Sequence, residues 1–167
     1  MDKYEPEYLA AHDIDWFCYI NCRPIHAASN GGTLPSIINN SLQNTINQKL
    51  VYSLHYIYDL EEIEVNKKYI NKLFATKDRG RSGFDLITMQ NNYLRAFIDM
   101  ARRGLYSFDR QYYNIYRSNK YIPIAWPKNY DETIRIKLES DYFIVEGIDF
   151  SKLNTVRGIN FGKMWRV

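Results

Sequence analysis

A histidine, two adjacent glycines and a proline lie within one short stretch, and together they could bind a phosphate-bearing ligand. His26 lies in an apolar run, Pro35 opens a helical pattern, and between them stand Ser29, Asn30, Gly31 and Gly32. Glycine lets backbone amides approach a ligand closely, and a helix N-terminus favours an anion. With a hydrogen bond from His26 to a ribose or phosphate, the stretch predicts a corner that binds an anion or nucleotide. The alternative is a tight turn in which Ser29 or Thr33 caps the helix and His26 is an ordinary strand residue.

Cysteine and histidine residues, which can bind metal ions, are also regularly spaced in this part of the sequence. Cys18, Cys22 and His26 recur every fourth residue, and His12 or His55 could complete a tetrahedral set. That spacing aligns side chains on a helix, but this segment has the pattern of a β-hairpin, on which they do not converge. Two cysteines are also too few for a disulfide framework and fit a reducing compartment. We therefore expect no metal site.

The elements that position these residues begin with a hairpin and a helix. The runs "DWFCYI" (15–20) and "PIHAAS" (24–29) are β-prone and flank a short turn. From Pro35 the apolar residues recur every fourth position, which predicts a helix with the inward residues Ile38, Leu42, Ile46, Leu50 and Leu54. The opposite face is nearly uncharged and consists of Asn39, Asn40, Gln43, Asn47 and Gln48. That face is either partly covered or a product of codon preference.

The rest of the chain predicts two more helices and then strands. Helical patterns run over "VNKKYINKLFATK" (65–77) and "DLITMQNNYLRAFIDMARRG" (85–104), and the second ends in two arginines and a glycine, which suit a helix C-terminus. The later β-prone runs are "YNIYR", "YIPIAW", "TIRIKL", "YFIVEG" and "RGINFG". A hairpin, about three helices and a run of strands predict an α+β fold with a mostly antiparallel sheet. We expect one domain over residues 1–167.

Composition and charge limit the classes of protein that this chain can represent. Hydrophobic residues make up 46% and charged residues 25% of the chain, which argues against disorder. No apolar run approaches the roughly 20 residues that span a bilayer, and the start "MDKYEPEYLAAHDID" is too polar for a secretory signal. We expect a cytoplasmic protein without membrane contact. Its basic residues concentrate in 65–128, which suits a nucleotide or nucleic acid or else pairs with the acidic first third.

Three stretches resemble ADP-ribosyltransferase-like domains of the nucleic-acid-modifying type. The stretch "IHAASNGGTLPSIINNSL" resembles their opening, which implies that His26 contacts the ribose of NAD while Ser29 to Gly32 position the dinucleotide. "RGLYSFDRQYY" would supply the nicotinamide-stacking Tyr106 with Ser107. "ESDYFIVEGIDFSKLNTVRGINF" resembles the family's ending and implies a catalytic acid, for which the candidates are Glu139, the neighbouring Asp141 and, at the far end of the strand, Glu146. The chain departs from the family in its extra strand before the histidine and in lacking a clear arginine after it.

The resemblance implies transfer of ADP-ribose from NAD to a nucleic-acid or protein acceptor. A carboxylate near the ribose would stabilise the oxocarbenium-like transition state, and Arg79 and Arg81 in "DRGRSG" could hold the acceptor or the pyrophosphate, or simply face solvent. Two other classes of function stay open. One is a nucleic-acid-binding module that stacks bases on Tyr93, Tyr112, Tyr113 and Tyr116. The other is a non-enzymatic interaction protein, such as an immunity factor or a phage-encoded inhibitor, that binds a partner protein or nucleotide.

Overall fold

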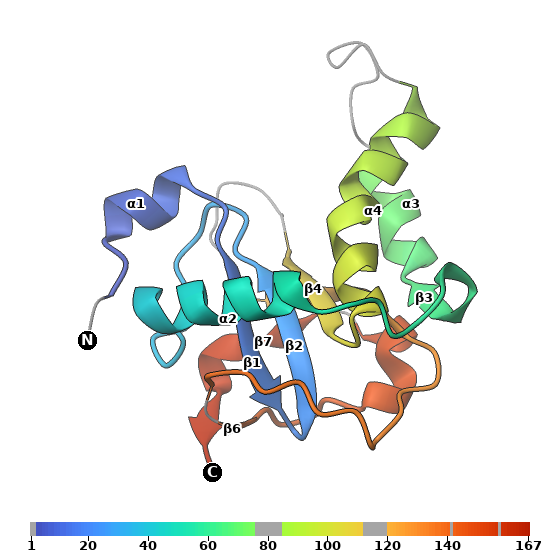
Figure 1. Ribbon diagram of the computed structural model, residues 1–167. Helices are drawn as coiled ribbons and strands as arrows, with labels where there is room; N and C mark the ends of the chain where they lie inside the picture. The colour runs from blue at the N-terminus through green and yellow to red at the C-terminus, as the bar shows by residue number, and fades with distance from the viewer. Residues whose placement is uncertain (1–2, 76–84, 112–119, 141, 157) are drawn as a thin grey trace.

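A mixed, mostly antiparallel sheet forms the centre of the protein (Figure 1). The computed structural model describes residues 3–75, 85–111, 120–140, 142–156 and 158–167. The described strands are β1 (Asp15–Ile20), β2 (Arg23–Ala28), β3 (Ile63–Val65), β4 (Tyr106–Arg110), β5 (Lys120–Pro127), β6 (Tyr142–Ile144), β7 (Ile159–Asn160) and β8 (Trp165–Arg166). Their order is β3-β5-β4-β2-β1-β6-β8, with β7 beside β5. The predicted α+β class is confirmed.

The described α-helices all precede β4, and the later part of the chain contributes strands and short 3-10 helices. The α-helices are α1 (Pro6–Ala11), α2 (Ser41–Ser53), α3 (Lys67–Ala75) and α4 (Leu86–Arg102). Short 3-10 helices are η1 (Leu60–Glu62), η2 (Phe150–Thr155) and η3 (Phe161–Lys163). As predicted, α4 ends before Gly104, whose φ of +95° suits the residue after a helix. Among the described residues, no helix has the length and apolar character needed to cross a bilayer.

The predicted N-terminal hairpin is present, and parallel strands flank it on both sides. β1 and β2 pair antiparallel across a turn in which Asn21 and Cys22 have φ values of 47° and 68°. β4 runs parallel to β2, and β6 runs parallel to β1. The pairing of β2 with β4 places His26 opposite Ser107 in register. Two residues that are far apart in the sequence are thus neighbours on one sheet face.

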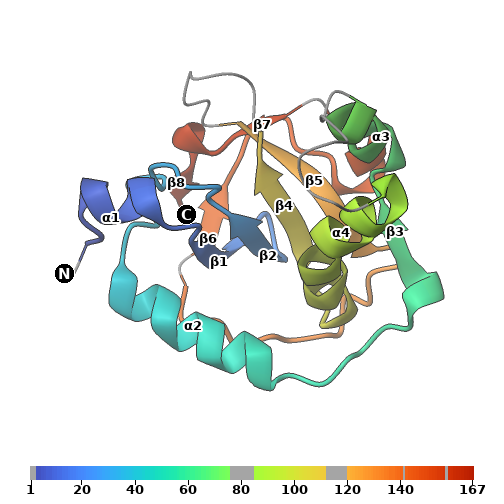
Figure 2. The same cartoon turned by 90° about the horizontal axis from the view of Figure 1, so that it is seen from above.

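Each face of the sheet has its own cover. Phe17 and the even-numbered residues of β2, such as His26, face the side on which α2, α3 and α4 lie (Figure 2). Trp16 and Cys18 face the other side, where they pack in one cluster with Leu34. That second cluster also includes residues of the 3-10 helices near the C-terminus. The alternation of strand side chains therefore separates a helix-covered face from a face covered mainly by irregular segments.

Helix α2 begins later and faces the core differently than its apolar pattern predicts. Residues 35–39 form a turn in which the amides of Ile38 and Asn39 both donate to the carbonyl of Pro35. The helix starts at Ser41, and Asn40 caps it by accepting from the amide of Gln43 at 3.0 Å. The prediction that Pro35 opens the helix is therefore wrong, as is the prediction that Ser29 or Thr33 caps it.

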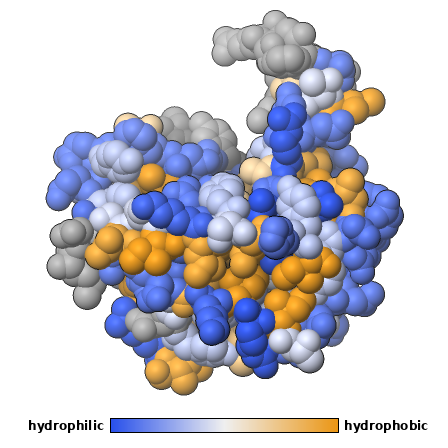
Figure 3. All heavy atoms as spheres, in the orientation of Figure 1, coloured by the Kyte–Doolittle hydropathy of each residue, from blue (hydrophilic) through white to orange (hydrophobic). Residues whose placement is uncertain are grey.

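Part of the predicted apolar stripe is in place, since Ile38 is buried and Leu50 and Leu54 pack against the core, but in the first turns of α2 the polar face turns toward the protein instead. Leu42 and Ile46 are 61% and 41% exposed, whereas Asn47 is fully buried. The Asn47 side chain accepts from the amide of Glu139 at 2.6 Å and donates to the Ser140 hydroxyl at 2.7 Å. These bonds satisfy a segment that has no strand neighbour there, which explains the orientation. Hydrophobic residues consequently gather at the surface on the face where α2 lies (Figure 3).

Several β-prone runs have outcomes that differ from the prediction. "TIRIKL" (133–138) is not a strand, although it buries Ile136 and Leu138 against the core. "YIPIAW" and "YFIVEG" contribute β5 and β6, and "RGINFG" contributes the short β7. "YNIYR" lies outside the described residues. Strand β4, which carries Tyr106 and Ser107, and the short β3 and α1 were not predicted as elements.

Candidate functional site

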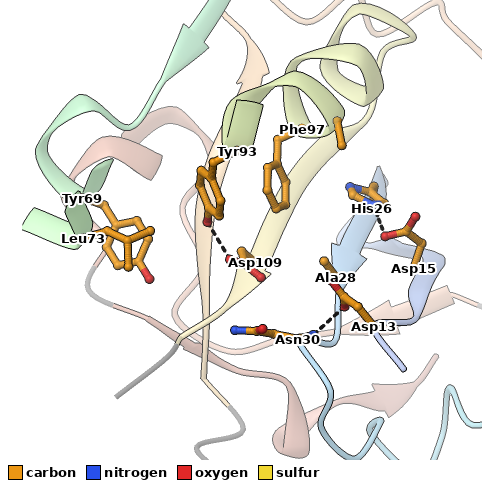
Figure 4. Close-up of a pocket in the computed structure, with 11 residues that line it drawn as sticks. Asp13, Asp15, His26, Ala28, Asn30, Tyr69, Leu73, Tyr93, Phe97 and Asp109 are labelled. Carbon is orange, nitrogen blue, oxygen red and sulfur yellow. Dashed lines mark hydrogen bonds and ion pairs between the residues drawn. The ribbon is translucent and has the colours of Figure 1, made fainter. Parts of the chain in front are cut away.

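A cavity of about 560 Å³ lies outside the carboxyl ends of the parallel strands β2 and β4, beneath α3 and α4 (Figure 4). In open α/β sheets, ligands bind outside the carboxyl ends of the parallel strands, and β2 and β4 give this mixed sheet one parallel pair with such an end. We call the cavity the acidic pocket, because Asp13, Asp15 and Asp109 line it together with His26 and Asn30. The described apolar and aromatic residues that complete its lining are Ala28, Tyr69, Leu73, Tyr93, Ala96 and Phe97.

His26 is held rigidly at the wall of the acidic pocket. Its ring is 1% exposed, with Nδ1 2.6 Å from the Ser107 hydroxyl and Nε2 3.0 Å from Oδ1 of Asp15. An ionised carboxylate only accepts hydrogen bonds, so Nε2 carries a proton and the Ser107 hydroxyl donates to Nδ1 when the ring is neutral. Phe17 and Phe97 pack against the ring, with centroids at 5.4 and 6.0 Å. The ring is therefore fixed in orientation by four neighbours.

The serine, histidine and aspartate resemble the composition of a hydrolase triad, but the geometry assigns the serine another role. Ser107 is fully buried and is not among the described residues that line the cavity. A nucleophile must reach its substrate, and its base must be oriented by a third group on the far side. Here the cavity is lined by His26 and by Asp15, the partner of Nε2, whereas Ser107, the partner of Nδ1, is buried away from it. Ser107 positions His26.

Two carboxyl groups of the pocket lie on strands, Asp15 on β1 and Asp109 on β4, and their pKa values are shifted in opposite directions. Burial alone would raise the pKa of Asp15, but the hydrogen bond and charge of His26, with a further bond from Tyr52, hold it below its usual value. Burial raises the pKa of Asp109 to about 7, and the charge of Asp13 adds to this rise. A hydrogen bond from the Tyr93 hydroxyl at 2.6 Å only partly offsets it. Near neutral pH, Asp15 is ionised and Asp109 exchanges a proton readily.

The Ser29–Gly32 corner uses its polar groups within the protein. The Asp13 carboxylate accepts the amide of Asn30 at 2.6 Å, so a carboxylate of the chain stands where a ligand phosphate was expected. The amide of Gly32 donates to the carbonyl of Ser29 at 3.1 Å. A Cβ atom on Gly32 would lie 1.3 Å from a guanidinium nitrogen of Arg110, so this glycine admits an arginine rather than a ligand. Within the corner, Asn30 is the residue that reaches the acidic pocket.

The other residues expected at the site are distributed more widely. Tyr106 is buried on the opposite face of β4 from Ser107, where its ring contacts Tyr130 and Phe150. Glu139 and Glu146 are exposed, and neither is among the described residues that line the acidic pocket. Asp141, Arg79, Arg81, Tyr112, Tyr113 and Tyr116 lie outside the described residues. The structure thus brings together His26, Asn30 and Ser107.

The sequence analysis missed the three aspartates of the pocket, although their spacing carried a signal. Asp15 is the first residue of β1 and Asp13 precedes it by two residues, while Asp109 follows Ser107 by two residues on β4. Side chains two positions apart on a strand share a face. Once His26 and Ser107 are placed on facing strands, this period of two selects Asp15 and Asp109 as their neighbours.

Cys18 and Cys22, whose regular spacing with His26 raised the question of a metal site, lie in different surroundings. Cys18 is buried in the core and Cys22 is exposed at the hairpin turn, and both are free thiols. In the part of the chain that the structure describes, no three His, Cys, Asp or Glu side chains are grouped so as to hold a metal ion.

In comparisons with known proteins, no family model, no curated protein and no solved structure matches the chain.

Proposed function

We propose that the acidic pocket binds the nicotinamide riboside end of NAD and cleaves the bond between the ribose and nicotinamide. The observation that supports this proposal most directly is the pair of carboxyl groups with oppositely shifted pKa values, Asp15 and Asp109, on one cavity. Such pairs divide the roles of charge stabilisation and proton transfer at glycosidic bonds. The nicotinamide ring is a flat cation, so the carboxylates attract it and the rings of Tyr93 and Phe97 offer it aromatic contact.

Each residue then has a defined part in the reaction. Asp15 stays ionised and stabilises the positive charge that develops on the ribose as the C–N bond breaks and its electron pair passes to the nicotinamide ring. His26 holds Asp15 in place through the 3.0 Å hydrogen bond. An acceptor hydroxyl or water forms the new bond to the ribose and gives its proton to Asp109, whose pKa of about 7 suits a general base near neutral pH.

The acceptor of ADP-ribose in this proposal is a nucleic acid or a protein, as the resemblance implies. The catalytic acid differs from the one that the resemblance implies: we assign the chemistry to Asp15 and Asp109 because they line the pocket with His26. The roles of Glu139 and Asp141 stay predictions that a variant can separate from this assignment.

The test is nicotinamide release from NAD, together with calorimetric titration of NAD into the protein. We expect Asp15→Asn and Asp109→Asn to lower the rate of release by about 100-fold or more, the usual contribution of one charge-stabilising or proton-transferring group. Glu7→Gln, which removes an exposed carboxylate on α1, serves as the control with an unchanged rate. Loss of release in Glu139→Gln but not in Asp109→Asn would move the chemistry to the C-terminal acid. Absence of both binding and release at millimolar NAD would refute the proposal.

A second candidate function, a non-enzymatic interaction protein, is favoured by the exposed apolar residues of α2 and the segment after it. These residues are Leu42, Ile46, Tyr52, Tyr56, Ile57 and Leu60, each at least 41% exposed. Exposed apolar patches of this kind mark interaction surfaces in many proteins. If NAD neither binds nor is cleaved, Leu42→Lys combined with Ile46→Lys is the variant to test against any candidate partner. It should abolish the complex while the far-UV circular dichroism spectrum stays unchanged.

A further inference from the structure

A second cavity adjoins the acidic pocket and carries the opposite charge. It also measures about 560 Å³ and is lined by Lys68 and Lys72, with Gln111, Asn154 and Thr155. We call it the basic pocket. Among its described lining residues there is no carboxylate, whereas the acidic pocket has three and no lysine or arginine among its own described lining residues.

The two pockets are neighbours in the fold. Tyr69 of α3 lines both, so one side chain forms a shared wall. The pairing of β4 with β5 also places the two pockets next to each other. Asp109 on β4 lines the acidic pocket, and Ile122, its partner in register on β5, lines the basic pocket. Directly paired residues on antiparallel strands have Cα atoms about 5 Å apart. The two cavities therefore lie side by side, with Tyr69 between them.

We propose that the basic pocket holds the phosphate groups of the same substrate, so that the substrate class is a nucleotide with a cationic base and not a nucleoside. This inference rests on the proposed function, since it places the phosphates relative to a ribose in the acidic pocket. The charge pattern is its main support. Asp13 and Asp15 repel a phosphate from the acidic pocket, and like charges at contact distance are strongly unfavourable away from bulk water.

The side chains of the basic pocket are suited to a phosphate. Lys68 and Lys72 are four residues apart on α3 and so lie on one face of the helix, next to Tyr69. Lysine binds phosphate as a compact positive charge. From the other side, η2 supplies the Thr155 hydroxyl and the Asn154 amide, both of which can donate to phosphate oxygens. Cations and neutral donors thus face each other across one cavity.

The experiment compares ligands that share the nicotinamide riboside part but differ in phosphate. NAD, nicotinamide riboside and inorganic pyrophosphate are each titrated into the wild type and into a Lys68→Glu, Lys72→Glu double variant. Lys49→Glu, an exposed charge reversal on α2, is the matched control. We expect the double variant to weaken NAD and pyrophosphate by about tenfold or more. Nicotinamide riboside, which is a cation without a phosphate, should bind the double variant at least as tightly as it binds the wild type.

The possible failures separate the two proposals. If the double variant binds NAD as tightly as the wild type does, the basic pocket does not hold the phosphates, and the proposed function is unaffected. Equal weakening of NAD and nicotinamide riboside would also overturn the inference, since the lysines would then act on the acidic pocket. If the wild type binds pyrophosphate through these lysines but binds neither NAD nor nicotinamide riboside, the phosphate site stands and the proposed function fails. Binding of none of the three ligands would overturn both.

Discussion

Replacement of Asp109 by asparagine should make the stability of the protein less dependent on pH. Burial raises the pKa of Asp109 from 3.8 to about 7. In the unfolded chain the carboxyl group returns to its ordinary value near 4. Between about pH 4 and pH 7 the folded protein therefore holds a proton that the unfolded chain has lost, and the free energy of unfolding of the wild type falls as the pH rises.

The size of this effect follows from the shift. Three pKa units correspond to about 4 kcal/mol, lost at about 1.4 kcal/mol per pH unit across that window. The asparagine side chain of the variant cannot titrate, has the shape of the aspartate and can still accept the hydrogen bond from the Tyr93 hydroxyl. The variant should therefore match the wild type near pH 4 and exceed its free energy of unfolding by up to about 4 kcal/mol above pH 7.

Urea unfolding, followed by tryptophan fluorescence at several pH values from about 4 to 8, measures this difference. The companion variant Tyr93→Phe removes the hydroxyl that lowers the pKa of Asp109, so its loss of stability should extend to higher pH than in the wild type. A constant difference between Asp109→Asn and the wild type over the whole pH range would refute the reasoning. It would mean that Asp109 is not protonated by burial in the folded protein.

Three further variants test other parts of the structure by urea unfolding. Asn47→Ala should cost about 2–3 kcal/mol because it removes the hydrogen bonds of a fully buried side chain to Glu139 and Ser140. Leu42→Ala on the exposed side of α2 should change stability by less than about 0.5 kcal/mol, and equal losses in the two variants would contradict the observed orientation of the helix. Gly32→Ala should cost about 1–3 kcal/mol by displacing the Arg110 guanidinium, and no change would show that this guanidinium moves freely. Asp15→Asn should destabilise the protein at neutral pH, since its pKa is lowered on folding, and the difference should vanish as the pH falls through that folded value; a difference that persists in acid would exclude this linkage.

The sequence predicts those parts of the fold whose signals are local. The six residues of β1 are β-prone throughout and end at a turn, so both bounds of the strand agree with the prediction. Helix α4 has a regular apolar stripe, Asp85 as its N-cap and Gly104 after its end. The orientation of α2 could not be predicted in this way. It depends on bonds between Asn47 and residues more than 90 positions later in the chain, which leave Leu42 in solvent.

The residues of the candidate site likewise differ in whether a local sequence signal could identify them. The sequence places His26 near a potential ligand corner, and the resemblance separately implies that Ser107 lies at the cofactor; the structure joins these two residues by a hydrogen bond. The sequence alone does not identify Asp15 or Asp109, because an aspartate on a strand can be assigned to a site only when the residues on the neighbouring strand are known. The register of β2 against β4 supplies that knowledge, and no local pattern encodes the register of a parallel pair.

The two parallel neighbours of the β1–β2 hairpin have a consequence for how the chain reaches its folded state. The hairpin can form as soon as residues 15–28 are available, but its flanking strands come from residues 106–110 and 142–144. During synthesis from the N-terminus, both of its edges therefore expose unpaired backbone groups while most of the chain is still being made. An incomplete chain that ends before residue 106 therefore carries a hairpin with two open edges, either of which can pair with another extended segment.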